Sequence, residues 1–88
     1  MASFIKDPDS TLDYSINWTL WLDGDIISQS TWEVPADLTL QAHSYEAVKT
    51  TVWLSGGNPG QSYSVVNRIT TEAGRVEDRT IIIRIRNR

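Results

Sequence analysis

Hydrophobic and polar residues alternate along most of the chain, and no long window repeats with the 3.6-residue period of a helix. Such alternation places every second side chain on the same face of a β-strand. The pattern is clearest in residues 61–71 and 78–88, where Ile81, Ile83 and Ile85 form one apolar face. The short segment TEAG between these two runs favours a turn, so the sequence predicts a C-terminal hairpin.

Five further segments show strand character, which predicts an all-β chain of about seven strands. The expected strands are residues 3–6, 13–22, 25–34, 38–46, 49–57, 61–71 and 78–88. In the second of these, Trp18, Leu20 and Leu22 would share the buried face and Trp21 would point the other way. Asp23-Gly24 is a strong type I′ turn signal and predicts a hairpin between the second and third strands. Pro35 would end the third strand.

Short strands separated by regular turns are typical of an immunoglobulin-like or fibronectin-III-like β-sandwich, and an OB-type barrel is the alternative. The 88 residues fit one domain spanning 1–88. The chain has no cysteine, which excludes a disulfide framework, thiolate catalysis and cysteine-based metal sites. Neither a secretory signal nor a membrane-spanning run is apparent, so we expect a protein that is cytosolic or assembled from the cytosol.

Charge is unevenly distributed along the sequence. Residues 1–59 contain eight acids and two lysines, a net charge of −6, whereas residues 60–88 contain six arginines and three acids, a net charge of +3. The two halves could steer toward a partner or pair with copies of the same chain, although a fold that interleaves them would mix the charges.

The glycine-rich run LSGGNPGQSY, residues 54–63, resembles nucleotide-binding loops only superficially. Ser55 stands where a P-loop has its first glycine, Gln61 stands where it has lysine, and a strand follows in place of a helix. The glycines instead suit backbone conformations with positive φ, and Pro59-Gly60 suits the centre of a type II turn. We therefore predict a connection between two strands on opposite sides of the sandwich.

Other candidate sites are weak, and we predict no cofactor and no metal site. Asp23 and Asp25 lack the full spacing of a calcium loop, and aspartate is common in turns for backbone reasons. His43 is the only histidine, and no serine or cysteine lies in a nucleophile motif around it. Nothing in the sequence supplies a nucleophile with its base, so we expect no enzyme activity.

Exposed aromatic and basic residues remain as candidates for binding a partner. Trp18 and Trp32 alternate with core positions, whereas Trp21 and Trp53 fall on the opposite faces. One or both of these two could be exposed at an interface, where tryptophan is enriched, or could pack under a neighbouring loop. The terminal RIRNR is basic and could bind phosphates. An overall pI near 4.9 argues against nucleic-acid binding. The arginines could equally protect an exposed strand against edge aggregation or bind an acidic protein surface.

Two segments carry a family resemblance that extends over nearly the whole chain. They are KDPD…DY…W, beginning at Lys6, and LSGG…Y.V.N.ITT..GR..DR, beginning at Leu54. With them the chain resembles short virion proteins of tailed bacteriophages, the phage fibre-tail adaptor family. The resemblance implies an immunoglobulin-like module without enzymatic activity, built into a virion tail and joining tail tube or connector proteins to fibre proteins.

We therefore expect a structural adaptor in the virion tail, assembled in the bacterial cytoplasm, present in several copies and bound to other virion proteins, but not to nucleic acid or membranes. The candidate contact residues are Trp21, Trp53, Asn58, Arg84, Arg86 and Arg88. The alternatives are an accessory sandwich that binds a glycan or protein ligand, with Trp21 or Trp53 holding the glycan, and a phage head or decoration protein.

Overall fold

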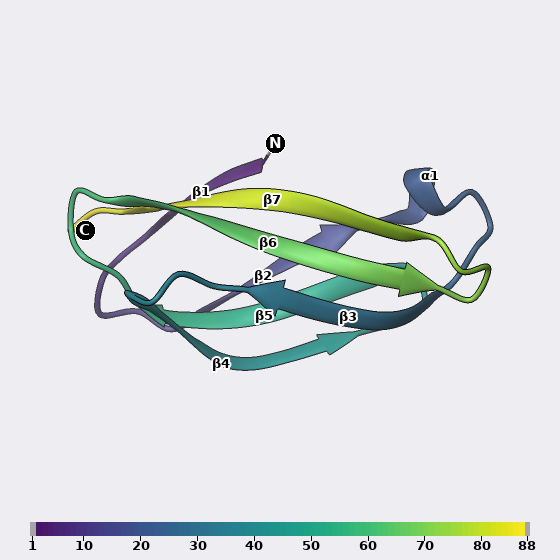
Figure 1. The fold of residues 1–88 in the computed structure, drawn as a ribbon. Helices are drawn as coiled ribbons and strands as arrows, with labels where there is room; N and C mark the ends of the chain where they lie inside the picture. The colour runs from purple at the N-terminus through teal and green to yellow at the C-terminus, as the bar shows by residue number, and fades with distance from the viewer. Residues whose placement is uncertain (1, 88) are drawn as a thin grey trace.

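The computed structural model describes residues 2–87, which contain seven β-strands and one short helix (Figure 1). The elements are β1 (Ala2–Lys6), β2 (Leu12–Asn17), α1 (Thr19–Leu22), β3 (Ile27–Glu33), β4 (Leu38–Tyr45), β5 (Lys49–Gly56), β6 (Ser62–Thr71) and β7 (Val76–Ile85). No helix in this part of the chain has the length and apolar character needed to cross a lipid bilayer.

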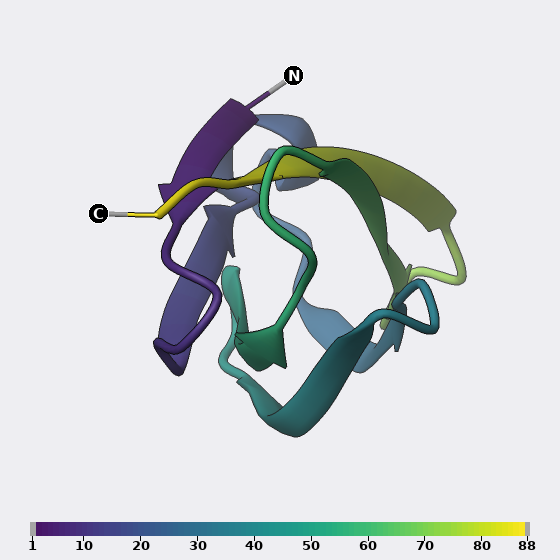
Figure 2. The ribbon, with the colours of Figure 1, turned by 90° about the vertical axis from the view of Figure 1, so that its left-hand side faces the viewer.

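The strands form two sheets that enclose a common core, as the view along the molecule shows (Figure 2). The four-stranded sheet A has the order β1-β7-β6-β3, and the three-stranded sheet B has the order β2-β5-β4. Strand β1 runs parallel to β7, and every other pair is antiparallel. This arrangement confirms the predicted immunoglobulin-like sandwich and excludes the alternative barrel.

The C-terminal hairpin is as predicted. Strands β6 and β7 pair in continuous register from Ser62↔Arg84 to Thr70↔Val76. Val65 and Ile69 are fully buried, and so are the isoleucines on the inner face of β7. Alternation is reliable here because both strands are long and each packs one face on the core.

The predicted second strand ends early, which corrects the expected positions of Leu20 and Trp21. Strand β2 stops at Asn17, and residues 19–22 form α1. Residues four apart share one face of a helix, just as they share one face of a strand. Trp18 and Leu22 are therefore buried as expected, but Leu20 is 95% exposed and not part of the core.

The predicted hairpin at Asp23-Gly24 is wrong. Strand β2 pairs with β5 in sheet B, whereas β3 pairs with β6 in sheet A, so the connection crosses between the sheets. Both turn residues have the positive φ that the motif suggested, 48° for Asp23 and 93° for Gly24. They use it to end α1, where the Asp23 backbone N–H donates to the Thr19 carbonyl.

The glycine-rich run connects β5 in sheet B to β6 in sheet A, as predicted. Gly60 has a φ of 85°, and the Gln61 N–H donates to the Asn58 carbonyl at 3.1 Å across the Pro59-Gly60 turn. This geometry is that of a type II turn. The glycines of this run therefore serve the backbone of a strand-to-strand connection.

A polar network lies in the middle of the core, around the fully buried Asn67 of β6. Its Oδ1 accepts hydrogen bonds from the Trp18 indole at 3.1 Å and from the Thr50 hydroxyl at 2.7 Å. Its Nδ2 donates to the Ser30 hydroxyl and to the Thr31 carbonyl, both at 3.0 Å. One amide thus links both sheets and the start of α1.

Asp25 ties the segment after α1 to the β6–β7 turn. Its carboxylate accepts hydrogen bonds from the Thr71 hydroxyl, the Ile26 backbone N–H and the Arg75 guanidinium, the last at 3.1 Å. The Thr71 bond contributes most, and together these donors lower the pKa of Asp25 to about 2. Relative to the protonated form, the ionised form of Asp25 is therefore more stable in the folded protein than in the unfolded chain.

We expect this carboxylate to make stability depend on acid pH. A carboxyl group with a lowered folded-state pKa stabilises the fold fully above its unfolded pKa of about 4, and this contribution is lost as the pH falls toward 2. Asp25→Asn should therefore flatten the pH dependence of the free energy of unfolding between about pH 4 and 2. Urea titrations at several pH values measure this, with exposed Glu72→Gln as the control. An unchanged pH dependence in Asp25→Asn would refute the assignment.

Candidate functional site

Three of the five arginines within residues 2–87 are engaged inside the domain. Arg68 forms a bidentate pair with Asp78, at 2.8 and 3.0 Å. Arg75 pairs with Asp25 and also donates to the Leu22 carbonyl at 2.7 Å. These two pairs neutralise part of the charge that the sequence separates, and one of them joins the acidic and basic halves.

The third engaged arginine, Arg79, bridges the two sheets. Its guanidinium lies 4.3 Å from the centroid of the Trp18 ring and donates to the Asn17 carbonyl at 3.3 Å. A cation over an indole face is attracted by the ring quadrupole. Arg79 thus contributes to the packing between β7 and the end of β2.

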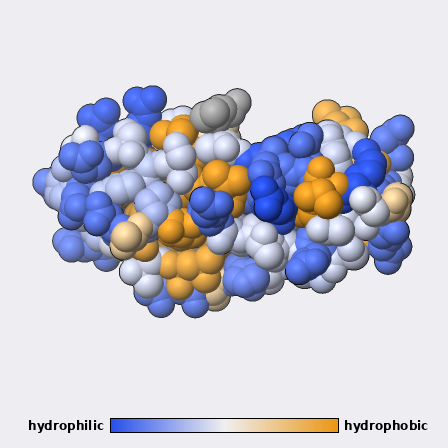
Figure 3. Space-filling view, viewed as in Figure 1, coloured by the Kyte–Doolittle hydropathy of each residue, from blue (hydrophilic) through white to orange (hydrophobic). Residues whose placement is uncertain are grey.

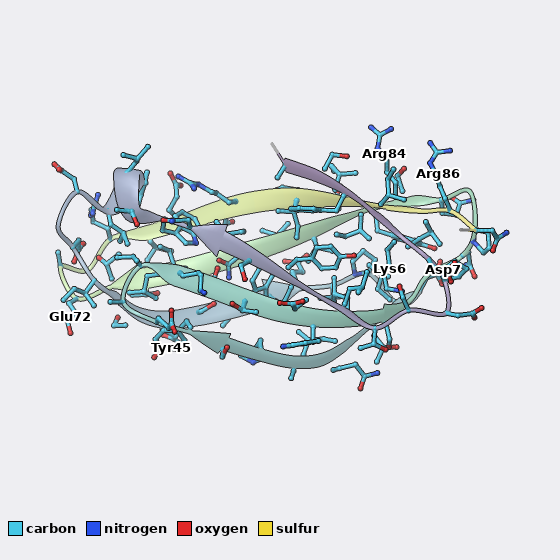
Figure 4. All side chains as sticks on the ribbon, turned by 180° about the vertical axis from the view of Figure 1, so that it is seen from behind. Lys6, Asp7, Tyr45, Glu72, Arg84 and Arg86 are labelled. Carbon is cyan, nitrogen blue, oxygen red and sulfur yellow. The ribbon has the colours of Figure 1, made fainter. Side chains whose placement is uncertain are left out.

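Arg84 and Arg86 differ from these three, because neither side chain has a hydrogen-bond or ion-pair partner within the described chain. Both are exposed, and they project side by side from the same side of the molecule (Figure 4). Arg84 is in register with Ile5 of β1, which is 48% exposed and faces outward with it. We refer to Ile5, Arg84 and Arg86 as the basic patch.

Beneath the basic patch, Lys6 is turned inward and fully buried (Figure 4). Its Nζ donates to the carbonyls of Gly56 and Asp7, both at 2.8 Å. Burial lowers the pKa of Lys6, and the nearby charges of Asp7 and Asp9 oppose this shift. Lys6 thus joins β1 to the glycine-rich connection and is not available to a partner.

Trp53 lies on a different face from the basic patch. It is 43% exposed at the centre of the outer face of sheet B, in register with Asp13 on one side and Ala42 on the other. On the same face, the hydroxyls of Ser15 and Thr51 are hydrogen-bonded at 2.9 Å. Trp53 is thus exposed, one of the two outcomes that the alternation left open, but the sandwich separates Trp53 from Arg84 and Arg86.

Trp21 is half-buried, not on an open strand face. Helix α1 packs its ring against Trp18, with centroids 5.6 Å apart and planes at 73°. The Arg75 guanidinium covers it at 4.2 Å. The strand reading of residues 13–22 misplaced this side chain, because the chain turns into a helix after Asn17.

Asn58 is exposed at the tip of the glycine-rich connection, but its polar groups bond within the domain. Its side-chain amide donates to Asp37 at 3.2 Å, and its backbone N–H donates to the Tyr63 hydroxyl at 3.0 Å. The N–H groups of Gly57, Gly60 and Gln61 likewise donate to backbone carbonyls of the chain. These amides are therefore not free to hold a phosphate. Arg88, the remaining predicted contact residue, lies outside the described residues.

The rest of the described surface offers little else for chemistry. Within residues 2–87, no three histidine, cysteine or acidic side chains group as metal ligands would. On the face shown in Figure 3, hydrophobic residues form separate clusters among hydrophilic ones. The buried core of a large protein interface is apolar, and this face has no single large apolar area that could form one. A partner that docks on this face would therefore be bound mainly through charged and polar groups.

Residues 6–84 match the model of a family described as "Podophage GP4 fiber-tail adaptor protein gp77". The matched segment begins at the buried Lys6 and ends at Arg84 of the basic patch. A search of curated protein sequences found no match.

Proposed function

The chain belongs to the podophage GP4 fiber-tail adaptor family, and from this membership we propose that it joins a fibre to the virion tail as a non-enzymatic structural protein. The basic patch is one of its docking surfaces. Its partner there is another virion protein, either of the tail tube, of the connector or of the fibre, that presents carboxylates. Several copies are built into each virion tail after synthesis in the host cytoplasm.

The observation that carries this proposal is the contrast among the arginines. Arg68, Arg75 and Arg79 satisfy their guanidinium groups inside the domain, whereas Arg84 and Arg86 present theirs together to solvent. A guanidinium can hold a carboxylate through two parallel hydrogen bonds. Two adjacent unpaired guanidiniums beside the exposed Ile5 are therefore well suited to an acidic protein surface.

Reversal of this charge tests the proposal. The double variant Arg84→Glu/Arg86→Glu, supplied to a phage that lacks the gene, should reduce the number of particles with fibres about tenfold or more, because it loses two charge-assisted contacts and adds repulsion. Electron microscopy of purified particles counts the fibres. Lys49→Glu serves as the control. It reverses an exposed charge at the start of β5 in sheet B, away from the basic patch, and should leave fibre attachment unchanged.

The fold of the double variant must be checked in parallel, by its urea unfolding midpoint. Both arginines are exposed and make no internal bonds, so stability should change little. A stable double variant that restores fibres as well as the wild type would refute the basic patch as a docking surface. A variant that fails to fold would instead assign the two arginines a structural role.

A second candidate function rests on Trp53. Its half-exposed ring has Asp13 and Ala42 beside it in register, and the same face carries the hydroxyls of Ser15 and Thr51. Among the described residues, no other large apolar side chain shares the outer face of sheet B. Such a face suits a sugar ring stacked on the indole better than an apolar protein interface. Binding on a glycan array that is lost in Trp53→Ala would support this candidate, and an array without any binding would remove it.

A further inference from the structure

Two strand edges on one side of the sandwich have no neighbour within residues 2–87. Strand β2 ends the order of sheet B, so its edge away from β5 is unpaired. On sheet A, β1 pairs with β7 only from Ala2↔Ile81 to Lys6↔Ile85. The preceding half of β7, residues 76–80, therefore lacks a partner on the side away from β6. Unpaired edges present backbone N–H and C=O groups that another strand can bind.

A groove of about 560 Å³ lies between these two edges. It is lined by Ala2, Ser15, Ile16, Asn17, Asp78, Arg79, Thr80 and Ile81. Ile16 and Ile81 are buried and give the groove an apolar floor. The start of β1 closes one end, because Ala2 contributes to the lining.

The order of the strands in sheet B explains the position of the groove. In constant-type domains a first strand lies beside the strand that corresponds to β2, in the sheet order ABED. Here the order β2-β5-β4 corresponds to BED, and β1 lies beside β7 instead. The place next to β2 that a first strand occupies in those domains is taken by no described residue.

The groove also contains a cation with spare hydrogen-bonding capacity. Arg79 donates one hydrogen bond, to the Asn17 carbonyl, and stacks on Trp18. Its other N–H groups have no acceptor within the described residues. Asp78, the acid beside it, already binds Arg68 with both oxygens. The groove is therefore complementary to a negatively charged group.

We propose that this groove receives an extended, carboxylate-bearing segment of a neighbouring virion protein, which adds a β-strand in line with β1. The segment runs parallel to β7 and pairs with residues 76–80, over about 16 Å. Its residue in register with Arg79 points inward, as Arg79 does, and is Asp or Glu. This inference rests on the adaptor function proposed above and names a second docking surface, distinct from the basic patch.

Photo-cross-linking in assembled particles tests the proposal. The photoreactive residue benzoylphenylalanine replaces Ser15 in one variant and Thr80 in another, so that the labels lie on the two sides of the groove. A strand between β2 and β7 is within reach of both labels, so both should link to the same short segment of one virion protein. A label at Thr39, on the outer face of sheet B but outside the groove, should not link to that segment.

Fibre-carrying particles in which the Ser15 and Thr80 labels give no link, or link to different segments, would overturn the strand site and leave the adaptor function intact. Particles that keep their fibres when the gene is deleted would instead refute the adaptor function itself. The two failures are therefore distinguishable.

A self-complemented chain provides an independent test. A four-residue extension placed directly before Met1, threonine-valine-threonine-glutamate, would continue β1 so that the glutamate is in register with Arg79 and the first threonine with Val76. This extension should raise the melting temperature and reduce fibre attachment to the level of the gene deletion, because it fills the groove. A glycine-serine-proline extension of equal length should do neither. A variant that is not stabilised, or that is stabilised and still attaches fibres, would contradict the proposal.

Discussion

Replacement of Asn67 by alanine is expected to lower the free energy of unfolding by about 3 kcal/mol, because several buried groups lose their partner at once. The Ser30 hydroxyl and the Thr31 carbonyl lose their hydrogen bonds to Nδ2, and the Trp18 indole keeps only a longer contact of 3.3 Å to the Thr50 hydroxyl. Each buried polar group left unsatisfied costs about 1–3 kcal/mol. Small domains have only about 5–15 kcal/mol of stability in total, so the loss is large.

Urea unfolding followed by tryptophan fluorescence measures this effect. The matched control is Gln41→Ala, which also removes an amide hydrogen bond, to Ser55 at 2.7 Å, but at an exposed position. The control should cost less than about 1 kcal/mol, since water replaces the lost partner. Equal destabilisation in both variants would show that the network around Asn67 does not hold the two sheets together.

Gly57→Ala is the second substitution expected to have a large effect, of about 3 kcal/mol. Gly57 has a φ of 98°, and an added Cβ would lie 2.6 Å from Cδ1 of Ile85 and 3.2 Å from Cδ2 of Leu38. Ile85 is 1% exposed and Leu38 is 4% exposed, so neither can move aside easily. Backbone strain of about 1–2 kcal/mol adds to the cost of overpacking, about 1–3 kcal/mol.

Gly60→Ala separates these two causes. Gly60 has a similar φ of 85°, but nothing lies within 4 Å of the position of its Cβ. This variant should therefore show only the backbone strain, about 1–2 kcal/mol. Thermal unfolding of both variants gives the difference. If Gly60→Ala destabilises as much as Gly57→Ala, close packing against Ile85 is not the reason for glycine at position 57.

The strands could largely be predicted from sequence because each packs one face on the core. Alternation located β6 and β7 well, and positive φ at the glycines was foreseen in the connection that follows β5. The error at residues 18–22 has a simple origin. Four residues are two strand periods and also about one helical turn, so Trp18 and Leu22 share a face in either structure. Leu20 and Trp21 distinguish the two structures: a strand would bury Leu20 and point Trp21 outward, whereas the helix exposes Leu20 and packs Trp21 against Trp18.

Asp23-Gly24 illustrates a second limit. The dipeptide predicted the backbone conformation correctly, but the same conformation can close a hairpin or end a helix. Which one forms depends on the partners of the flanking strands. Here β2 pairs with β5 and β3 pairs with β6, and these long-range pairings have no local signal.

The proposed docking surfaces could only partly be predicted from the sequence. Basic residues near the C-terminus are evident, but the sequence does not reveal which arginines find partners inside the domain. Lys6 was not recognised as buried, because a lysine at the end of a short strand normally reaches solvent. The groove beside β2 was also missed, since an absent neighbour strand becomes apparent only from the sheet order.

From family membership and the basic patch, we propose that the chain connects fibres to the podophage tail. The most direct measurement is electron microscopy of particles made without this gene, with and without the wild-type chain supplied separately. We expect tails without fibres in the first case and restored fibres in the second. Particles that carry a normal complement of fibres without the chain would contradict it.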